Sequence, residues 1–298
     1  MNHISNLRGV HTAMVTPFTD DNKVDYGALE ESIGRQIDAR VDGLLFLGTT
    51  GEAPTLSPKE RKEIIGWGLK FNHIASIMVG TGSNDTKEAV RLTKEAADLG
   101  ADYALVSTPE YNKPSQEGIY QHFAQVALHG GLPIVVYNVP SRTGVNIQPE
   151  TLERIAELDH IAGVKEASGN MGQIMDVLYR FRDKDFAVLS GDDSLTLPML
   201  SYGGQGVVSV VSNLLPAEMV KLIEEWDAHD KAGARIMHTH LYPAMKASFL
   251  EGNPASVKTM MELAGYCSGD CRLPMTRPSD ANRDKLKEVV ASYGLLHK

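Results

Sequence analysis

A lysine inside an apolar segment is the strongest chemical signal in the sequence. Lys165 lies within the segment Ile161–Ser168, where a permanently charged ammonium would be costly without a partner. Desolvation lowers the pKa of a lysine, and a neutral amine can attack a carbonyl carbon to form an imine. The structural alternative is a lysine paired with Glu166 or another nearby carboxylate. We therefore take Schiff-base chemistry at Lys165 as a hypothesis beside that alternative.

Imine chemistry needs a group that moves protons, because water must leave the carbinolamine and protons must move at the adjacent carbon. Tyr137, at the end of another apolar segment, is a candidate for this shuttle. Thr49, at the end of a third segment, could relay a proton to it. The alternative for Tyr137 is a rim aromatic whose hydroxyl is satisfied by a neighbour.

Two further features could bind carboxylates. The turn Gly48–Gly51 presents successive backbone N–H groups flanked by glycines, and such a nest can hold an anion with help from threonine hydroxyls. Arg142 follows Tyr137 closely and could grip a second carboxylate through two parallel hydrogen bonds. A plain tight loop and a surface ion pair are the respective alternatives.

Motifs for other cofactors and for metals are weak. Gly80–Gly82 lacks the third glycine of a dinucleotide fingerprint, and no Walker A pattern occurs. His238 and His240 are two residues apart, which puts them on different faces of the expected helix, whereas helical ligand pairs need a spacing of three or four. Asp192 and Asp193 have no third ligand in view and suit a loop or helix-capping role. We expect no metal site.

Composition narrows the class of protein. The 298 residues are 42% hydrophobic, and 29 basic against 38 acidic residues give a net charge of −9, which argues against nucleic acid as the main partner. Cys267 and Cys271 are too few for a disulfide scaffold and are expected to be plain thiols. Residues 1–8 are polar, unlike a signal peptide, and no segment reaches the length of a membrane span. We expect a cytoplasmic protein with no membrane partner.

Short β-rich segments alternate with amphipathic segments along most of the chain and place the candidate residues. Several are nearly continuous apolar runs, which is typical of strands covered on both faces. Helix starts are marked by N-caps such as Ser57 and Asp85, and helix ends by Gly100 and His129–Gly131. The expected strands are Gly9–Phe18, Gly43–Gly48, Ser76–Gly82, Tyr103–Pro109, Pro133–Val139, Ile161–Ser168, Phe186–Gly191 and Gly206–Val210.

Eight strand–helix alternations predict parallel pairing with right-handed crossovers, and eight strands close a (β/α)8 or TIM barrel. A doubly wound open sheet is the alternative. After Asp230 the strand signal ends, and three helices are expected, over Lys231–Leu250, Pro254–Gly265 and Asp280–Tyr293. We predict an α/β fold with a catalytic barrel over residues 1–230 and a small C-terminal helical appendage over residues 231–298. In a barrel, function gathers at the C-terminal ends of the strands, where the candidates fall.

In their order and spacing, the motifs resemble the 4-hydroxy-tetrahydrodipicolinate synthases, formerly called dihydrodipicolinate synthases, of the pyruvate-dependent class I aldolase superfamily. The resemblance covers essentially the whole chain. It rests on Gly48–Glu52, Tyr111–Gly118, Tyr137–Gly144, Gly163–Ala167, Leu189–Asp193 and Arg272–Met275.

The resemblance implies a lyase of lysine and diaminopimelate biosynthesis that condenses pyruvate with L-aspartate 4-semialdehyde. Lys165 would form the Schiff base with pyruvate, and Tyr137 would donate and accept protons. Thr49 would link Tyr137 to Tyr111, which would reach in from a neighbouring subunit. The family is typically a homotetramer, and no metal or organic cofactor is implied.

The resemblance also assigns the binding residues. Thr50 would bind the pyruvate carboxylate with help from the backbone at Val208, and Gly191 would join the substrate-binding set. Arg142 would hold the carboxylate of aspartate semialdehyde at the mouth. A sister lyase that cleaves N-acetylneuraminate or a 2-keto-3-deoxy sugar acid is the nearest alternative, but a sugar tail gains little from a fixed guanidinium. A ligand-sensing barrel would tolerate loss of Lys165 or Tyr137, both of which are present.

Two departures from the family pattern concern feedback by lysine. In members that lysine inhibits, a second aromatic residue commonly precedes the relay tyrosine, and here that place is Glu110. The loop Ala53–Arg61 lacks the histidines often found in the inhibitor site, whereas Asn84 and Glu88 still match it. The hypothesis is that feedback by lysine is weak or absent.

Overall fold

The computed structural model of the chain describes residues 7–297. The prediction that the polar N-terminus carries no signal peptide concerns residues 1–8, of which residues 1–6 lie outside the described residues. Residue 298, the last residue of the predicted appendage, also lies outside them.

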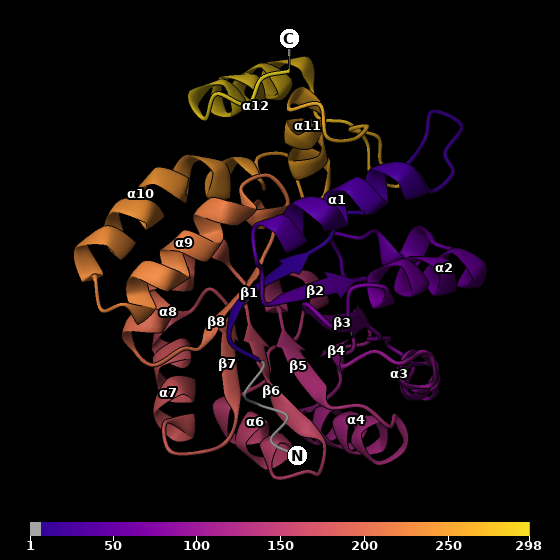
Figure 1. Cartoon of the computed structure of the whole chain (residues 1–298). Coiled ribbons are helices and arrows are strands. Elements are labelled where there is room, and N and C mark those ends of the chain that lie inside the picture. The colour runs from indigo at the N-terminus through magenta and orange to yellow at the C-terminus, as the bar shows by residue number, and fades with distance from the viewer. Residues whose placement is uncertain (1–6, 298) are drawn as a thin grey trace.

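Eight parallel strands close into a barrel in chain order (Figure 1). Closure is made by β1 and β8, which pair in parallel register. The predicted TIM barrel is confirmed, and the open doubly wound sheet is wrong. The strands are β1 Gly9–Ala13, β2 Gly43–Phe46, β3 Ser76–Gly80, β4 Tyr103–Ser107, β5 Ile134–Asn138, β6 Ile161–Glu166, β7 Ala187–Ser190 and β8 Gly206–Ser209.

Side chains on alternate positions of each strand fill two separate layers. One set points into the barrel and forms a core that includes Leu45, Met78, Val135 and Leu189. The other set packs outward against the helices in a larger core. Because successive side chains of a strand point to opposite faces, this arrangement explains the nearly continuous apolar runs of the sequence.

Helices cover the outside of the barrel, and their caps follow the local sequence. Ser57 and Glu60 form the expected capping box at the start of α2, and Gly100 ends α3 in the left-handed conformation. At the end of α4 the left-handed residue is Gly131, whereas Gly130 is right-handed. The helices of this layer are α1 Tyr26–Asp38, α2 Pro58–Leu69, α3 Thr86–Leu99, α4 Gln116–His129, α6 Pro149–Ala156, α7 Met171–Phe181, α8 Thr196–Ser201 and α9 Pro216–Asp227.

Short helical turns occupy several loops after the strands, and the sequence analysis did not anticipate them. One α-helical turn, α5, carries Arg142, and the other three are 3-10 turns at the ends of β2, β7 and β8. Each turn follows a strand whose predicted end lies one or two residues too late, because the chain leaves the strand geometry there to build a loop. Their bounds are α5 Pro140–Thr143, η2 Ala53–Thr55, η3 Asp193–Leu195 and η4 Val211–Asn213.

Three helices follow the barrel, as expected: α10 Lys231–Ala247, α11 Ala255–Leu263 and α12 Asp280–Ser292. Helix α10 packs along α9, and α12 packs on α11 (Figure 1). Val257 and Met261 of α11 form a small apolar cluster with Val15 and Val210, which follow β1 and β8. The C-terminal segment therefore contacts the loops at the C-terminal ends of the strands.

Two further sequence expectations concern membrane spans and thiols. Within residues 7–297, the structure contains no helix with the length and apolarity needed to cross a bilayer. Cys267 and Cys271 are free thiols, as expected. Burial raises the pKa of Cys267 to about 11 and that of Cys271 to about 12, so both are protonated at neutral pH.

Candidate active site

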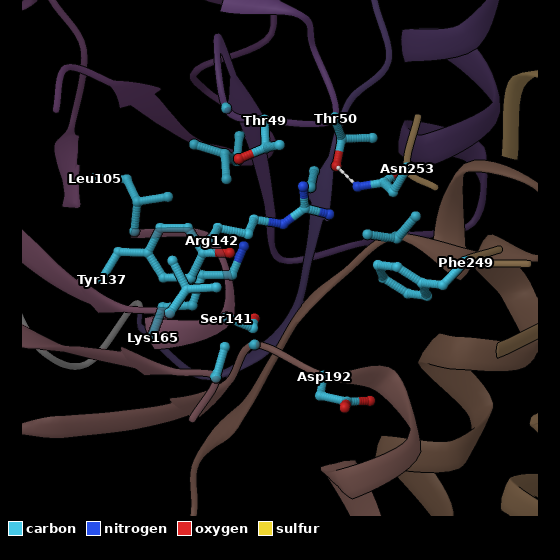
Figure 2. A pocket seen from close by; sticks show the side chains of 17 residues that line it. Thr49, Thr50, Leu105, Tyr137, Ser141, Arg142, Lys165, Asp192, Phe249 and Asn253 are labelled. Carbon is cyan, nitrogen blue, oxygen red and sulfur yellow. Dashed lines mark hydrogen bonds between the residues drawn. The ribbon is translucent and has the colours of Figure 1, made fainter. Parts of the chain in front are cut away.

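A cavity of about 380 Å³ opens at the C-terminal ends of the strands (Figure 2). Its volume is in the range of small-molecule sites, and active sites of TIM barrels lie at this end. Most of the predicted site residues meet there. The lining residues are Ala13, Leu45, Gly48, Thr49, Thr50, Leu105, Tyr137, Val139, Ser141, Arg142, Lys165, Ala167, Gly191, Asp192, Val210, Phe249 and Asn253.

Lys165 lies on β6 with its side chain at the cavity, and only 5% of the residue is exposed. Burial lowers its pKa from 10.5 to about 7; the charge of Asp193 opposes this change, and that of Arg142 adds to it. A large fraction of the amine is therefore neutral near pH 7. A neutral, sterically available amine is the nucleophile that imine formation requires.

Glu166 does not pair with Lys165, and within residues 7–297 no other carboxylate forms an ion pair with that lysine, although the charge of Asp193 acts on it. The Glu166 carboxylate lies on the opposite face of β6, where it accepts hydrogen bonds from Asn138 Nδ2 at 3.0 Å and from the Ser168 N–H at 2.7 Å. This contact ties the tip of β6 to the tip of β5. It thereby fixes the two strands that carry Lys165 and Tyr137.

Tyr137 is the direct neighbour of Lys165 across the β5–β6 register. The Lys165 Nζ lies 4.3 Å from the centroid of the Tyr137 ring. Burial raises the pKa of the tyrosine to about 12, and the nearby Arg142 guanidinium partly opposes this change. The phenol is therefore protonated at neutral pH and can donate a proton beside the lysine.

Gly191 leaves room for the lysine side chain. A Cβ at this position would lie 2.7 Å from the Ala167 Cβ and 3.1 Å from the Lys165 Cγ. Contacts this short would force the lysine or its neighbour to shift. The glycine predicted from sequence as a substrate-binding residue thus lines the cavity and also gives Lys165 its space.

The turn after β2 places Thr49 and Thr50 in the wall of the cavity, on the other side from Asp192 (Figure 2). The backbone N–H groups of Gly51 and Glu52 bond back to Gly48 and Thr49 within the turn. No such bond to another described residue occupies the N–H groups of Thr49 and Thr50. The predicted nest therefore has two free donors as well as the threonine hydroxyls.

Arg142 enters the cavity from the short helix α5 after β5 (Figure 2). Pro140 occupies the first turn of this helix, and Thr143 closes it through a bond from its hydroxyl to the Val139 carbonyl at 3.2 Å. The guanidinium is a permanent cation that can bind a planar anion in bidentate fashion. The cavity therefore offers an anion nest at one wall and a guanidinium at another.

Two predicted site residues do not line the cavity. Tyr111 lies in a loop after β4 with positive φ (70°) and is 88% exposed in the single chain. Val208 is 1% exposed and packs in the barrel interior, whereas its neighbour on the same face, Val210, lines the cavity. The proposed roles of Tyr111 and of the Val208 backbone remain predictions.

Several lining residues were not predicted as site residues, and those with polar or aromatic side chains are Ser141, Asp192, Phe249 and Asn253. Asp192 does have the predicted capping role, because its carboxylate accepts from the Ser194 N–H at 2.9 Å. Phe249 and Asn253 come from the segment between α10 and α11. The sequence carried no signal for them, since periodicity does not reveal which loop of an appendage folds over the barrel.

Comparison with known proteins points to the same family as the sequence motifs. The Dihydrodipicolinate synthetase family matches residues 6–293. The chain is 46% identical over 291 residues to the 4-hydroxy-tetrahydrodipicolinate synthase of Syntrophus aciditrophicus, over 97% of this chain and 99% of that relative.

Two solved structures have nearly the same fold. One is a monomeric variant of dihydrodipicolinate synthase, with a TM-score of 0.96 and 40% identity over 99% of both chains. The other is the dihydrodipicolinate synthase of Acinetobacter baumannii in complex with pyruvate, with a TM-score of 0.94 and 36% identity over 97% of this chain and 100% of that one. The chain thus belongs to the dihydrodipicolinate synthetase family.

Proposed function

We propose that this enzyme condenses pyruvate with L-aspartate 4-semialdehyde, through a Schiff base on Lys165, to give 4-hydroxy-tetrahydrodipicolinate. The observation that carries the proposal is the buried Lys165, with a pKa of about 7, in one cavity with Tyr137 and Arg142. The activity named for the Syntrophus relative and the pyruvate bound by the Acinetobacter relative support the same substrates.

The first step joins pyruvate to the enzyme. The pyruvate carboxylate binds to the N–H groups of Thr49 and Thr50 and to the Thr50 hydroxyl. The neutral Lys165 amine attacks the keto carbon, and the resulting carbinolamine loses water to form the imine. Tyr137 donates the proton that the leaving hydroxyl requires, which its protonated state at neutral pH allows.

The second step forms the carbon–carbon bond. The Tyr137 phenolate left by the first step takes a proton from the methyl group and converts the protonated imine to an enamine. The terminal carbon of the enamine attacks the aldehyde of aspartate semialdehyde, and the alkoxide that forms takes the proton back from Tyr137. Arg142 binds the carboxylate of this second substrate and orients its aldehyde. The substrate amine then attacks the imine carbon, closes the ring by transimination and releases Lys165.

We propose a homo-oligomer, with a homotetramer as the expected state. A homotetramer would let Tyr111 of a neighbouring subunit complete a proton relay through Thr49 to Tyr137, and the 88% exposure of Tyr111 in one chain supports such a contact. The monomeric variant among the relatives leaves the number of subunits to be measured. A cytoplasmic location remains a prediction from the sequence.

The test is pyruvate consumption by the purified protein, with and without aspartate semialdehyde, beside a Lys165→Ala variant. Consumption that requires both the aldehyde and Lys165 is the expected result. Pyruvate that is trapped on Lys165 by borohydride but not consumed would keep the imine chemistry and overturn the choice of aldehyde. Cleavage of a 2-keto-3-deoxy sugar acid would then be assayed.

A further inference from the structure

The segment between α10 and α11 supplies one wall of the cavity through Phe249 and Asn253. Asn253 is 5% exposed, and its Nδ2 donates a hydrogen bond of 2.9 Å to the Thr50 Oγ1 (Figure 2). Its Oδ1 is buried with no partner among residues 7–297. An unpaired buried acceptor is unfavourable, and an asparagine with a purely structural role would normally avoid it.

The contact between Asn253 and Thr50 is held by a buried ion pair beside it. The Lys258 Nζ lies 2.8 Å from Glu52 Oε1 and donates to the Thr16 carbonyl at 2.9 Å, and both members of the pair are almost fully buried. The Arg272 N–H bonds the other carboxylate oxygen at 2.8 Å. The C-terminal segment is thus tied to the turn after β2 at Glu52 as well as at Thr50.

The direction of the bond decides what the Thr50 hydroxyl can do. A threonine hydroxyl has one hydrogen to donate and two lone pairs that accept. When the amide of Asn253 donates to Thr50, it occupies a lone pair and leaves the hydroxyl hydrogen free. That hydrogen can then point to an anion in the cavity, next to the free N–H groups of Thr49 and Thr50.

We propose that Asn253 is a positioning residue that acts through Thr50, holding its hydroxyl as a hydrogen-bond donor to the carboxylate of the keto-acid substrate. This inference rests on the proposed function, because it assigns that carboxylate to the Thr49–Thr50 wall. On this inference, the segment between α10 and α11 contributes to pyruvate binding.

The test compares Asn253→Ala, Thr50→Val and the double variant by their KM for pyruvate and their kcat at saturating aldehyde. Loss of one hydrogen bond predicts that Asn253→Ala raises the pyruvate KM about 3- to 10-fold, with kcat nearly unchanged. The double variant should have the same pyruvate KM as Thr50→Val, because Asn253 has no hydroxyl left to orient. KM effects that multiply in the double variant would mean that Asn253 acts without Thr50 and would overturn the inference.

Two further variants separate positioning from general loosening. Asn253→Leu keeps most of the side-chain volume without the amide and should raise the pyruvate KM as much as Asn253→Ala. Asn282→Ala makes the same truncation in α12, where the Asn282 amide bonds Glu251 away from the cavity, and should leave the pyruvate KM unchanged. An equal rise in pyruvate KM in Asn282→Ala would contradict a specific role for Asn253.

The half-saturation of borohydride trapping by pyruvate gives a second readout that needs no aldehyde. If the unaltered protein traps pyruvate but does not consume it with aspartate semialdehyde, the proposed function fails while Asn253 can still be tested. Asn253→Ala should then raise the half-saturating pyruvate concentration by the same factor. An unchanged half-saturation would overturn the inference on its own.

Discussion

Burial favours the neutral form of two barrel residues, Lys165 and Tyr137, at neutral pH. Burial destabilises a charge, so it lowers the pKa of the lysine to about 7 and raises that of the tyrosine to about 12. The result is a partly neutral amine beside a protonated phenol. Imine formation needs both, one as nucleophile and one as acid.

The lysine pKa predicts a pH dependence for the first chemical step. The ammonium form predominates below pH 7 and cannot attack, so the rate of imine formation with pyruvate should fall about tenfold per pH unit there. Above about pH 7 the amine is neutral and the rate should level off. Trapping with cyanoborohydride over pH 5 to 9 measures this profile. A rate that still rises about tenfold per unit at pH 9, as the ordinary lysine value of 10.5 requires, would contradict it.

Arg142 should affect the second substrate and leave the first nearly unchanged. Replacement by methionine keeps the apolar stem and removes the charge-assisted bonds, so the KM for aspartate semialdehyde should rise about 10- to 100-fold. Half-saturation of pyruvate trapping should stay within a factor of about two. Kinetics with each substrate varied in turn would test this split, and a larger effect on pyruvate would place Arg142 at the wrong carboxylate.

At the scale of elements, the turn after β2 is held from the far end of the chain. Glu52 lies in this turn with φ of 54°, and its carboxylate is neutralised by Lys258 of α11 in a nearly dry environment. Desolvating the two charges is costly, and the pair is tolerable because each has additional hydrogen bonds. The barrel and the C-terminal helices are therefore coupled at the active-site end.

The buried pair should show strong non-additivity. Lys258→Met leaves Glu52 charged and unpaired, and should lower the free energy of unfolding by about 3 to 5 kcal/mol. The double variant Lys258→Met with Glu52→Gln removes both charges and should recover a large part of that loss. Denaturant unfolding of the two single variants and the double variant tests this, and additive losses would show that the two residues do not act as a pair.

The strand pattern predicted from the sequence was accurate in the number of strands and, to within one residue, in where they start, but not in where they end. Strand β1 ends at Ala13 and not at Phe18, because Thr16 turns to bond the Gly51 carbonyl and Phe18 bridges to Val24. Helix α5 was missed because four residues are too few to show a helical period. The pattern of apolar residues predicts the strands and helices, whereas the geometry of the loops depends on contacts between distant segments.

The site residues also fall into those that the sequence could predict and those that it could not. Lys165 and Tyr137 were predictable because each lies near the C-terminal end of a predicted strand. In a barrel of parallel strands these ends gather at one end of the molecule. Asn253 was not predictable, since its position at Thr50 depends on how the loop between α10 and α11, 203 residues later in the chain, packs on the barrel. Tyr111 was named through family resemblance, and its exposed place in one chain leaves its role to be tested.

At the scale of the whole molecule, we expect feedback by lysine to be weak even though the catalytic residues are present. The sequence has Glu110 where lysine-inhibited relatives commonly have a second aromatic residue, and the loop after Glu52 lacks the expected histidines. We predict that physiological concentrations of lysine inhibit weakly or not at all. Steady-state assays at rising lysine concentration measure this, and strong inhibition would refute the assignment of those positions.

The central claim is that Lys165 forms the imine with pyruvate, and the most direct test is to locate the covalent adduct. Borohydride reduction in the presence of pyruvate, followed by proteolysis and mass spectrometry, should find one modified lysine, at Lys165. The modification should be absent without pyruvate and lost in Lys165→Ala. Pyruvate-dependent labelling at a different lysine, or none at all in a protein that still consumes pyruvate, would contradict the account.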